Sequence, residues 1–414
     1  MGTCRRRNHV YEKNQLPAPV RALILAGDLG DGHRQAARAL AQGCGRPDSP
    51  VQAEVIDYMQ EIYALLHPVI RYCFLKGVEK APSLYGYFYR KSRMNEEMSL
   101  FSKSFLKLGM SKLLGLLRDR KPDVVICTFP LASAAVSLLK AQGLSSVPLV
   151  TVITDYADHA LWVQPHTDLY LVGSEHVAQA LYRRGISSSC VSVTGIPIRK
   201  SFFEPGDRET FRRQLGLDPL KPVVLVMGGG CGLMGKDMRA LLRSEALRLR
   251  AQLVFVCGSN AAAKQSLEEE LALKPTPSVR IVGFVEDIHR WMGAADMLLT
   301  KPGGLTTSEA VAMKLPMLLY KPIPGQEEEN AAVLEGAGVA IRASKERKLL
   351  DQVLELIDSP GLLATMRQQA ERFRCEQPTQ RAWDAMFRLQ AGPYEGSPAW
   401  PAVASVRESV KEAW

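Results

Sequence analysis

Short apolar runs that alternate with helical patterns are the feature that most constrains the fold of this 414-residue chain. The first run, residues 21–27 (RALILAG), has the length and composition of a buried parallel strand. Comparable runs follow at residues 52–56, 124–128, 149–154, 169–172, 191–194, 223–227, 253–257, 279–282, 297–300, 316–320 and 339–341. Because strands that alternate with helices pack as parallel sheets covered by helices, the pattern predicts an α/β fold.

The apolar runs form two series, and residues 199–220 separate them. This spacing predicts two doubly wound, Rossmann-like domains that follow one another along the chain. We expect residues 1–20 to be a flexible N-terminal tail, residues 21–198 the first domain and residues 199–375 the second domain. Residues 376–414 would then form a C-terminal helix and a loose tail rich in glycine and proline.

Residues 283–330 predict a pocket for a nucleotide diphosphate. Two short strands in this stretch are each followed by a helix, and a Pro-Gly-Gly turn at residues 302–304 precedes the helix expected at 306–313. Such a turn directs unpaired backbone N–H groups and a helix N-terminus at an anion. Glu309 lies one helical turn inside that helix, where a carboxylate can reach the hydroxyls of a sugar.

A second glycine-rich loop follows the predicted strand 223–227. Residues 228–235 (GGGCGLMG) contain closely spaced glycines, among them Gly228, Gly229 and Gly230, whose backbone amides could approach a diphosphate without obstruction. The loop is not a P-loop, because Asp237 stands where that motif requires serine or threonine after the lysine. A plain glycine turn is the alternative interpretation.

His33 lies at the mouth of the loop that follows the first strand, preceded by Gly32. A single histidine is more often structural than functional. Open α/β sheets, however, bind ligands at the carboxyl ends of their strands, and a histidine there can take a proton from an attacking hydroxyl near neutral pH. The third glycine of a dinucleotide fingerprint is absent, which disfavours a nicotinamide or flavin site.

Acidic residues follow the predicted strand 149–154 in the segment TDYADHALW (residues 154–162). Asp155 could orient a base or bind hydroxyls, and it could equally be the N-cap of a turn. The cysteines are widely spaced and form no cluster with histidine at the spacing of a metal site, so we expect a reducing environment and no structural metal.

The net charge of +9 is concentrated in one region. Residues 71–121 contain 12 basic and 4 acidic residues, a net charge of +8. Aromatic residues accompany the basic ones, as Tyr87, Arg90, Lys91 and Arg93 show. This composition suits an anionic lipid surface, and it could also bind RNA, although no RNA-binding module is recognisable.

The sequence contains no apolar run of 18 residues that would predict a membrane-spanning helix. Its N-terminus is basic but lacks the apolar segment of a secretory signal. We therefore expect a cytoplasmic protein that is peripheral on the inner face of the cell membrane.

Taken together, five segments resemble glycosyltransferase family 28, and specifically the diacylglycerol glucosyltransferases and monogalactosyldiacylglycerol synthases. The segments are GDLGDGHRQAARAL (residues 27–40), TDYADHALWVQPHTDLYLVGSE (154–175), VTGIPIRKSF (193–202), GGGCGLMG (228–235) and residues 283–330. The resemblance implies a GT-B fold, in which two Rossmann-like domains face a central cleft. The first domain would bind the acceptor and dock on the membrane, and the second would bind a UDP-sugar.

The resemblance also implies roles for individual residues. His33 would be the general base that activates a hydroxyl of diacylglycerol, with Asp155 as a helper, and the reaction would invert the anomeric carbon to give a β-glycoside. The donor would be UDP-glucose or UDP-galactose, and the departing UDP would need no metal or other cofactor. The donor-binding residues would be Phe284 and Val285 at the uracil, Glu309 at the ribose, Gly228, Gly229, Gly230, Gly303, Gly304, Thr306 and Thr307 at the diphosphate, and Gln326, Glu327 and Asn330 near the sugar hydroxyls.

The chain departs from the family pattern at two places. Asp31 interrupts the glycines before the histidine, and residues 326–329 (QEEE) are unusually acidic. Two other functions of the same fold remain open: transfer of N-acetylglucosamine to a lipid-linked peptidoglycan precursor, and a UDP-sugar epimerase or binding protein. The basic insertion at residues 58–121 favours diacylglycerol over the first, and a soluble epimerase would not need it.

Overall fold

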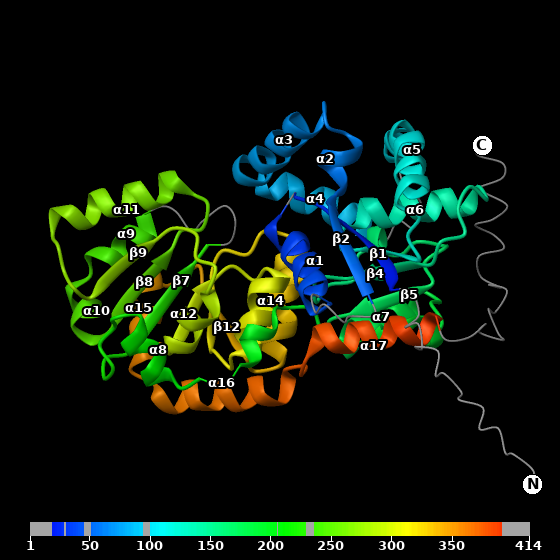
Figure 1. Cartoon of the computed structure of the whole chain (residues 1–414). Coiled ribbons are helices and arrows are strands. Elements are labelled where there is room, and N and C mark those ends of the chain that lie inside the picture. The colour runs from blue at the N-terminus through cyan, green and yellow to red at the C-terminus, as the bar shows by residue number, and fades with distance from the viewer. Residues whose placement is uncertain are drawn as a thin grey trace, which may run out of the picture.

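The computed structural model describes residues 19–28, 30–44, 51–93, 100–204, 206–228 and 236–390. Within these residues it contains two parallel sheets of six strands each. This confirms the α/β class with two doubly wound halves that the alternating apolar runs predict. Figure 1 shows the two halves side by side, with helices on both faces of each sheet.

The first sheet has the strand order β2-β1-β3-β4-β5-β6. Its strands are β1 (Val20–Ala26), β2 (Val51–Asp57), β3 (Val124–Cys127), β4 (Leu149–Val152), β5 (Leu169–Val172) and β6 (Val191–Val193). The helices of this half are α1 (Asp31–Gly43), α2 (Tyr58–Ile62), α3 (His67–Lys80), α4 (Pro82–Arg93), α5 (Leu100–Arg120), α6 (Pro130–Ala141) and α7 (Glu175–Arg183), with short 3₁₀ helices at η1 (Ala160–Trp162) and η2 (Ser188–Cys190).

The second sheet has the strand order β12-β11-β10-β7-β8-β9. Its strands are β7 (Val223–Met227), β8 (Gln252–Val256), β9 (Val279–Val282), β10 (Met297–Thr300), β11 (Met317–Leu319) and β12 (Ala340–Arg342). The remaining helices are η3 (Lys200–Phe203), α8 (Arg208–Gln214), α9 (Lys236–Arg243), α10 (Glu245–Arg250), α11 (Ala261–Leu273), α12 (Ile288–Ala294), α13 (Gly304–Ala312), α14 (Gln326–Gly336), α15 (Leu349–Ile357), α16 (Pro360–Phe373) and α17 (Pro378–Gln390).

Two helix starts differ from the sequence prediction. Helix α13 begins at Gly304 rather than residue 306, so the Pro-Gly-Gly turn runs directly into the helix. Helix α14 begins at Gln326, in a segment that the sequence presented as the end of a loop. Glu327 and Glu328 therefore lie in the first turn of α14, where negative charge is stabilised by the helix dipole.

Apolar side chains cover both faces of the first sheet. One cluster packs β1 and β3 against α5 and α6, and another packs the opposite face against α1 and α17. Helix α17 thus returns from the second half of the chain to the first, as Figure 1 shows below α7. Its Trp383 is buried, and the indole Nε1 donates a hydrogen bond of 3.1 Å to Leu40 O.

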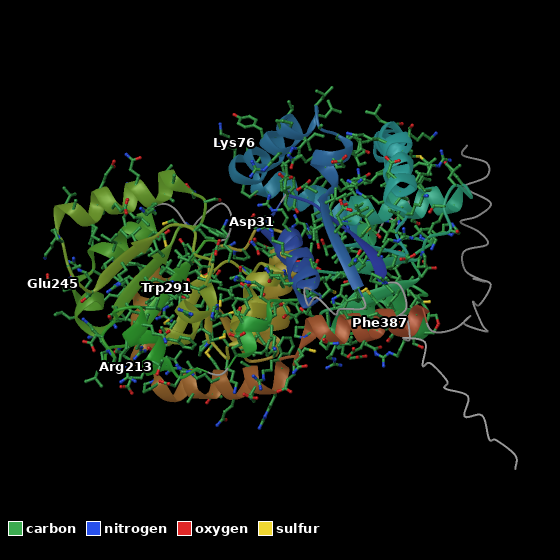
Figure 2. All side chains as sticks on the ribbon, viewed as in Figure 1. Asp31, Lys76, Arg213, Glu245, Trp291 and Phe387 are labelled. Atoms are coloured by element: carbon green, nitrogen blue, oxygen red, sulfur yellow. The ribbon has the colours of Figure 1, made fainter. Side chains whose placement is uncertain are left out.

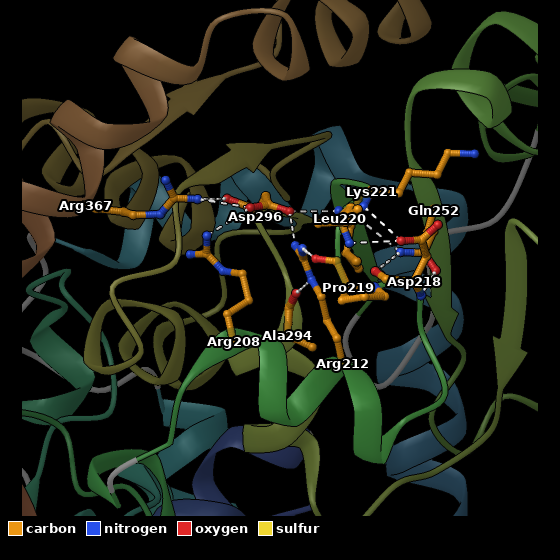
Figure 3. Close-up of polar contacts among 11 residues, drawn as sticks. Arg208, Arg212, Asp218, Pro219, Leu220, Lys221, Gln252, Ala294, Asp296 and Arg367 are labelled. Carbon is orange, nitrogen blue, oxygen red and sulfur yellow. Dashed lines mark hydrogen bonds and ion pairs between the residues drawn. The ribbon is translucent and has the colours of Figure 1, made fainter.

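Asp296, which lies between α12 and β10, connects several elements of the second half (Figure 3). Its carboxylate forms ion pairs with Arg208, Arg212 and Arg367 and accepts a hydrogen bond from Val223 N at 2.8 Å. Arg212 is buried and also donates to Ala294 O at 3.0 Å. Because a buried guanidinium is costly unless it is paired, we assign this group to the stability of the fold.

Candidate functional site

The candidate site lies where the carboxyl ends of the first sheet's strands meet helix α13 of the second half. Strands β1 and β2 pair in register up to Ala26 and Asp57, so the segments after them emerge at the same edge. Helix α1, which follows β1, contacts α13 directly. Figure 2 shows Asp31, at the start of α1, between the two halves of the molecule.

His33 is the third residue of α1, and aromatic rings surround its imidazole. The ring centroids of Phe129 and Trp162 lie 5.5 and 5.8 Å from that of His33. His33 Nδ1 lies 2.9 Å from the hydroxyl oxygen of Thr154, and the Thr128 hydroxyl donates to His33 O at 2.9 Å. The imidazole is therefore held in one orientation, with Nε2 making no hydrogen bond to another described residue.

Burial lowers the pKa of His33, while the negative charge of Asp155 and a hydrogen bond with the backbone of Thr128 act to raise it. The net shift keeps the imidazole neutral at neutral pH. When Nδ1–H donates to Thr154, Nε2 presents a lone pair, as a general base requires.

Asp155 is buried, and its carboxylate contacts the other half of the chain. Its Oδ1 accepts a hydrogen bond of 3.1 Å from Asn330 Nδ2. No helix begins directly after Asp155, so Asp155 is not an N-cap. The next helix along the chain is η1, whose N-cap is His159. Asp155 therefore acts on His33 through its charge, and Thr154 is the residue that orients the ring.

Asn330 links the two halves through its amide. Its Oδ1 accepts from Tyr156 N at 2.8 Å, and its Nδ2 also donates to Pro302 O at 3.0 Å. The Tyr156 hydroxyl lies 2.8 Å from Ser308 Oγ in α13. The side-chain amide of Asn330, which was expected near the donor sugar, thus forms hydrogen bonds that join the two halves.

The close approach of the two halves requires glycine at the start of α13. A Cβ atom on Gly304 would lie 2.1 Å from Thr154 O, so no side chain fits there. Gly32 of α1 faces the same helix, since a Cβ at this position would lie 3.8 Å from Leu305 Cβ. Gly303 is the N-cap of α13.

The first turn of α13 contains the residues expected at the diphosphate. The leading backbone N–H groups of a helix have no partner within it. The Thr307 hydroxyl donates to Gly303 O at 2.8 Å and is used within the helix. The half-buried Thr306 makes no side-chain hydrogen bond with another described residue.

Glu309 is buried one turn further along α13. Burial raises its pKa to about 7, and the positive charge of Arg199 acts in the opposite direction. Its carboxylate forms no hydrogen bond or ion pair with another described residue. A buried carboxylate without a partner is costly, and such groups are more frequent at functional sites than elsewhere.

The loop after β9 contains Phe284 and Val285, the residues expected at the uracil. Phe284 is 63% exposed, whereas Val285 packs against the apolar cluster of the second half. Arg199 holds this loop, because its Nη1 donates to Glu286 O at 2.5 Å while the guanidinium lies 5.3 Å from the Phe202 ring. The sequence analysis did not single out Arg199, although it lies within the conspicuous segment 193–202.

The loop before α14 places the residues expected at the donor sugar. Glu327 Oε2 accepts a hydrogen bond of 2.7 Å from Ile323 N. Burial raises the pKa of Glu327, and the charge of Lys301 acts to lower it. Gln326, half-buried, is the first residue of α14. Lys301, which follows β10, was another residue that the sequence analysis missed, since a single lysine after a strand has no distinctive pattern.

Of the second glycine-rich loop, Gly228 is buried at the end of β7. Gly229 and Gly230 lie outside the described residues. Asp28, which follows β1, contacts His67 Nε2 at 2.8 Å and Arg71 Nε at 3.1 Å through its carboxylate. These contacts connect the end of β1 to helix α3.

The basic aromatic stretch at residues 71–121 extends over α3, α4 and α5, with α3 near the top of Figure 1, α4 beneath it and Lys76 of α3 marked in Figure 2. Tyr87, Arg90 and Lys91 are exposed on α4, while the side chain of Arg93 lies outside the described residues. Large exposed apolar residues gather on α3, α4 and the turn before them: Leu65, Leu66, Val69, Tyr72, Leu84 and Tyr87. Among the described residues, no helix has the length and apolar character needed to cross a bilayer.

Known protein families and solved structures resemble both halves of the chain. Residues 33–198 match the family model of monogalactosyldiacylglycerol (MGDG) synthase, and residues 207–373 match that of the glycosyl transferases group 1. Solved structures with the same fold include MurG of Acinetobacter baumannii, with a TM-score of 0.57 and 15% identity over 89% of this chain and all of that chain. The S. aureus MnaA-UDP co-structure has a TM-score of 0.58 and 16% identity over 92% of this chain and 99% of that one.

Curated relatives are more similar in sequence. The processive diacylglycerol beta-glucosyltransferase of Bacillus licheniformis is 34% identical over 345 residues, which cover 83% of this chain and 88% of the relative. The protein of the same name from Bacillus subtilis is 33% identical over 84% of this chain and 89% of its own length. The chain therefore belongs to glycosyltransferase family 28, in the group of the diacylglycerol glucosyltransferases and monogalactosyldiacylglycerol synthases.

Proposed function

We propose that the protein transfers a hexose from a UDP-sugar to the hydroxyl of diacylglycerol at a membrane surface. One observation carries the proposal. His33, which is neutral and makes no hydrogen bond at Nε2 with another described residue, lies on one side of the interface, while the start of α13 and Glu309 lie on the other side. The family supplies the substrate class, because its named relatives are diacylglycerol glucosyltransferases.

The chemistry is a single displacement at the anomeric carbon. His33 Nε2 accepts the proton of the lipid hydroxyl as its oxygen forms a bond to C1, and the bond from C1 to the UDP oxygen breaks on the opposite side. The electron pair of that bond leaves with UDP, so the configuration inverts and the product is a β-glycoside. Asp155 stabilises the imidazolium that forms, since its charge favours the protonated ring.

The protein's own positive groups support the departing UDP. The amide groups of α13 and the dipole of this helix favour negative charge at the diphosphate, and Lys301 and Arg199 add full charges nearby. We therefore propose that turnover requires neither a metal nor another cofactor. Unchanged turnover after treatment with EDTA is the expected result, and loss that added Mg²⁺ restores would contradict it.

The membrane part of the proposal rests on α3 and α4. Exposed Val69, Tyr72 and Tyr87 could insert among lipid headgroups while exposed Arg90 and Lys91 contact anionic phosphates. We place the protein on the inner face of the cell membrane, in contact with anionic lipid.

Solved structures of the same fold include UDP-N-acetylglucosamine 2-epimerases and MurG, but at 14–16% identity they support the fold alone.

The donor sugar is best tested directly. We favour glucose over galactose, because the curated relatives are named glucosyltransferases. The experiment incubates the protein with UDP-glucose or UDP-galactose and vesicles that contain diacylglycerol, and analyses the lipids by mass and chromatography. A monohexosyl or dihexosyl diacylglycerol from UDP-glucose supports the proposal, and the absence of any hexosyl lipid from either donor would refute it.

A further inference from the structure

Helix α4 contacts the donor side of the interface through its inner face. Gly86 is buried there, and a Cβ atom on it would lie 2.4 Å from Pro324 Cβ. The ring of Tyr89 covers Gly325, where an added Cβ would lie 2.6 Å from the ring carbons. The backbone of Gly325 has a φ of 102°, a conformation that favours glycine. Helix and loop are therefore in full contact, with no room for a side chain at either glycine.

The contacted loop is hydrogen-bonded to Glu327 and Glu328 of α14. Ile323 N donates to Glu327 Oε2 at 2.7 Å, and Gly325 N donates to Glu328 Oε2 at 3.2 Å. These hydrogen bonds join the loop to the first turn of α14. A displacement of Pro324 would therefore displace the carboxylate of Glu327.

Tyr85 supports the inner face from the side of α3. The Tyr85 ring packs between Tyr89 of α4 and Phe74 of α3, at centroid distances of 6.3 and 6.1 Å. Burial raises the pKa of Tyr85 to about 12, with further contributions from the negative charges of Asp155 and Glu327. Tyr85 thus connects α4 to α3 behind the ring that covers Gly325.

The outer face of α4 has the opposite character. Leu84 and Tyr87 are each 55% exposed, and Lys91 is exposed beside them. Arg90 is also exposed but lies at the border of the two faces, since its Nη1 would lie 3.3 Å from a Cβ atom on Gly86. These are the side chains to which the proposed function assigns contact with the membrane. One helix of three turns therefore presents one face to lipid and the other to the donor loop.

We propose that α4 is a positioning helix: Gly86 and Tyr89 on its inner face fix the loop at residues 321–325, so that lipid contact of the outer face strengthens the binding of the UDP-sugar. The inference rests on the proposed docking of α4 on the membrane. Binding linkage is reciprocal, so the UDP-sugar must strengthen vesicle binding by the same factor. The device would favour donor binding where the acceptor lipid is present.

Gly86→Ala tests this contact with little risk to the helix. Alanine favours a helix relative to glycine, while the new methyl group would push Pro324 away. Gly77→Ala is the matched control, because it makes the same change in neighbouring α3 at a position where a Cβ meets no atom within 4 Å. Tyr89→Leu, which removes the ring over Gly325, is the second variant.

The measurement is the affinity for UDP-glucose by equilibrium dialysis, with and without vesicles of phosphatidylglycerol and phosphatidylcholine that lack diacylglycerol. For the wild type and Gly77→Ala, we expect vesicles to tighten binding about fivefold or more. Gly86→Ala and Tyr89→Leu should still bind UDP-glucose and sediment with vesicles, but the vesicles should no longer change the affinity.

Separate results test the separate claims. Failure of the wild type to sediment would contradict the proposed membrane docking and remove the coupling with it. Failure to bind UDP-glucose in any condition would contradict the proposed donor. Wild-type protein that sediments and binds UDP-glucose equally well with and without vesicles would overturn the coupling alone, as would an equal vesicle effect in Gly86→Ala.

Discussion

Glu309 is the acidic residue of the interface whose protonation should change nearest to neutral pH, because burial raises its pKa to about 7. Its ionised carboxylate can accept hydrogen bonds from two ribose hydroxyls, whereas the protonated form loses one acceptor. Raising the pH through 7 ionises the group. We therefore expect UDP-glucose, whose diphosphate diester does not titrate in this range, to bind about tenfold more tightly at pH 8 than at pH 6.

Glu309→Gln is the control for this pH dependence. The variant should bind UDP-glucose weakly and with the same affinity at both pH values, as measured by equilibrium dialysis. Wild-type binding that is independent of pH, or a pH dependence that persists in Glu309→Gln, would show that Glu309 does not contact the donor.

Asp155→Asn should change the pH profile of catalysis through His33. Asp155 raises the pKa of His33 against the larger lowering by burial, so the loss of its charge should lower this pKa further. The acid limb of kcat/KM for diacylglycerol, measured at saturating UDP-glucose, should move to lower pH. A limb that stays in place or moves to higher pH would exclude this electrostatic role.

His33 was predicted from its position after the first strand, because strand ends are where such sheets bind ligands. The residues that support it could not be predicted in the same way. Thr154 is 121 residues away from His33, and Asn330 is 175 residues away from Asp155, so only the folded chain brings them together. Local patterns carry no information about such pairs.

Helix α4 should bind anionic membranes through its exposed basic residues. Arg90→Glu combined with Lys91→Glu reverses two charges, and each basic residue near an anionic surface contributes about 1 kcal/mol to binding. We expect the double variant to sediment with phosphatidylglycerol vesicles at least tenfold more weakly, while UDP binding in solution is unchanged.

The control for that experiment places the same charge change elsewhere. Lys345→Glu combined with Arg372→Glu alters exposed residues of the second half, Arg372 on α16 at the bottom of Figure 1. This variant should sediment like the wild type. Equal weakening in both variants would mean that net charge, and not α4, determines membrane binding.

The basic insertion folds as helices α2 to α5. The inner face of α4 could not be recognised from the sequence, since Gly86 contacts Pro324, which lies far along the chain. The same limit applies to α13 and α14. Their first turns begin at Gly304 and Gln326 because packing between the halves and hydrogen bonds to loop amides decide the boundary.

At the scale of the whole molecule, α17 joins the end of the described chain to the first half. Trp383→Ala removes a buried ring and the hydrogen bond to Leu40 O, which should lower the free energy of unfolding by about 3–5 kcal/mol. Urea denaturation monitored by circular dichroism measures this change. Asp384→Ala, on the exposed face of the same helix, should lower it by less than about 0.5 kcal/mol, and a similar loss in both would contradict the packing role of Trp383.

The alternation of strands and helices was enough to predict two parallel sheets, because hydrophobic periodicity is a local property. It could not predict that α17 crosses back beneath the first sheet, nor that Asn330 and Gly304 bring the two halves together. Those features depend on the complementarity of distant surfaces. The proposed site forms only when the two halves pack together, since its base and its donor-binding helix come from different halves.

The most direct test of the account is the anomeric configuration of the lipid product, determined by proton NMR after reaction of the wild type and His33→Ala with UDP-glucose and diacylglycerol vesicles. We predict a β-glycoside from the wild type, because His33 activates the hydroxyl for displacement from the face opposite UDP. His33→Ala should bind UDP normally but form product about 10²–10⁴-fold more slowly. An α-glycoside, or undiminished turnover in His33→Ala, would contradict the mechanism.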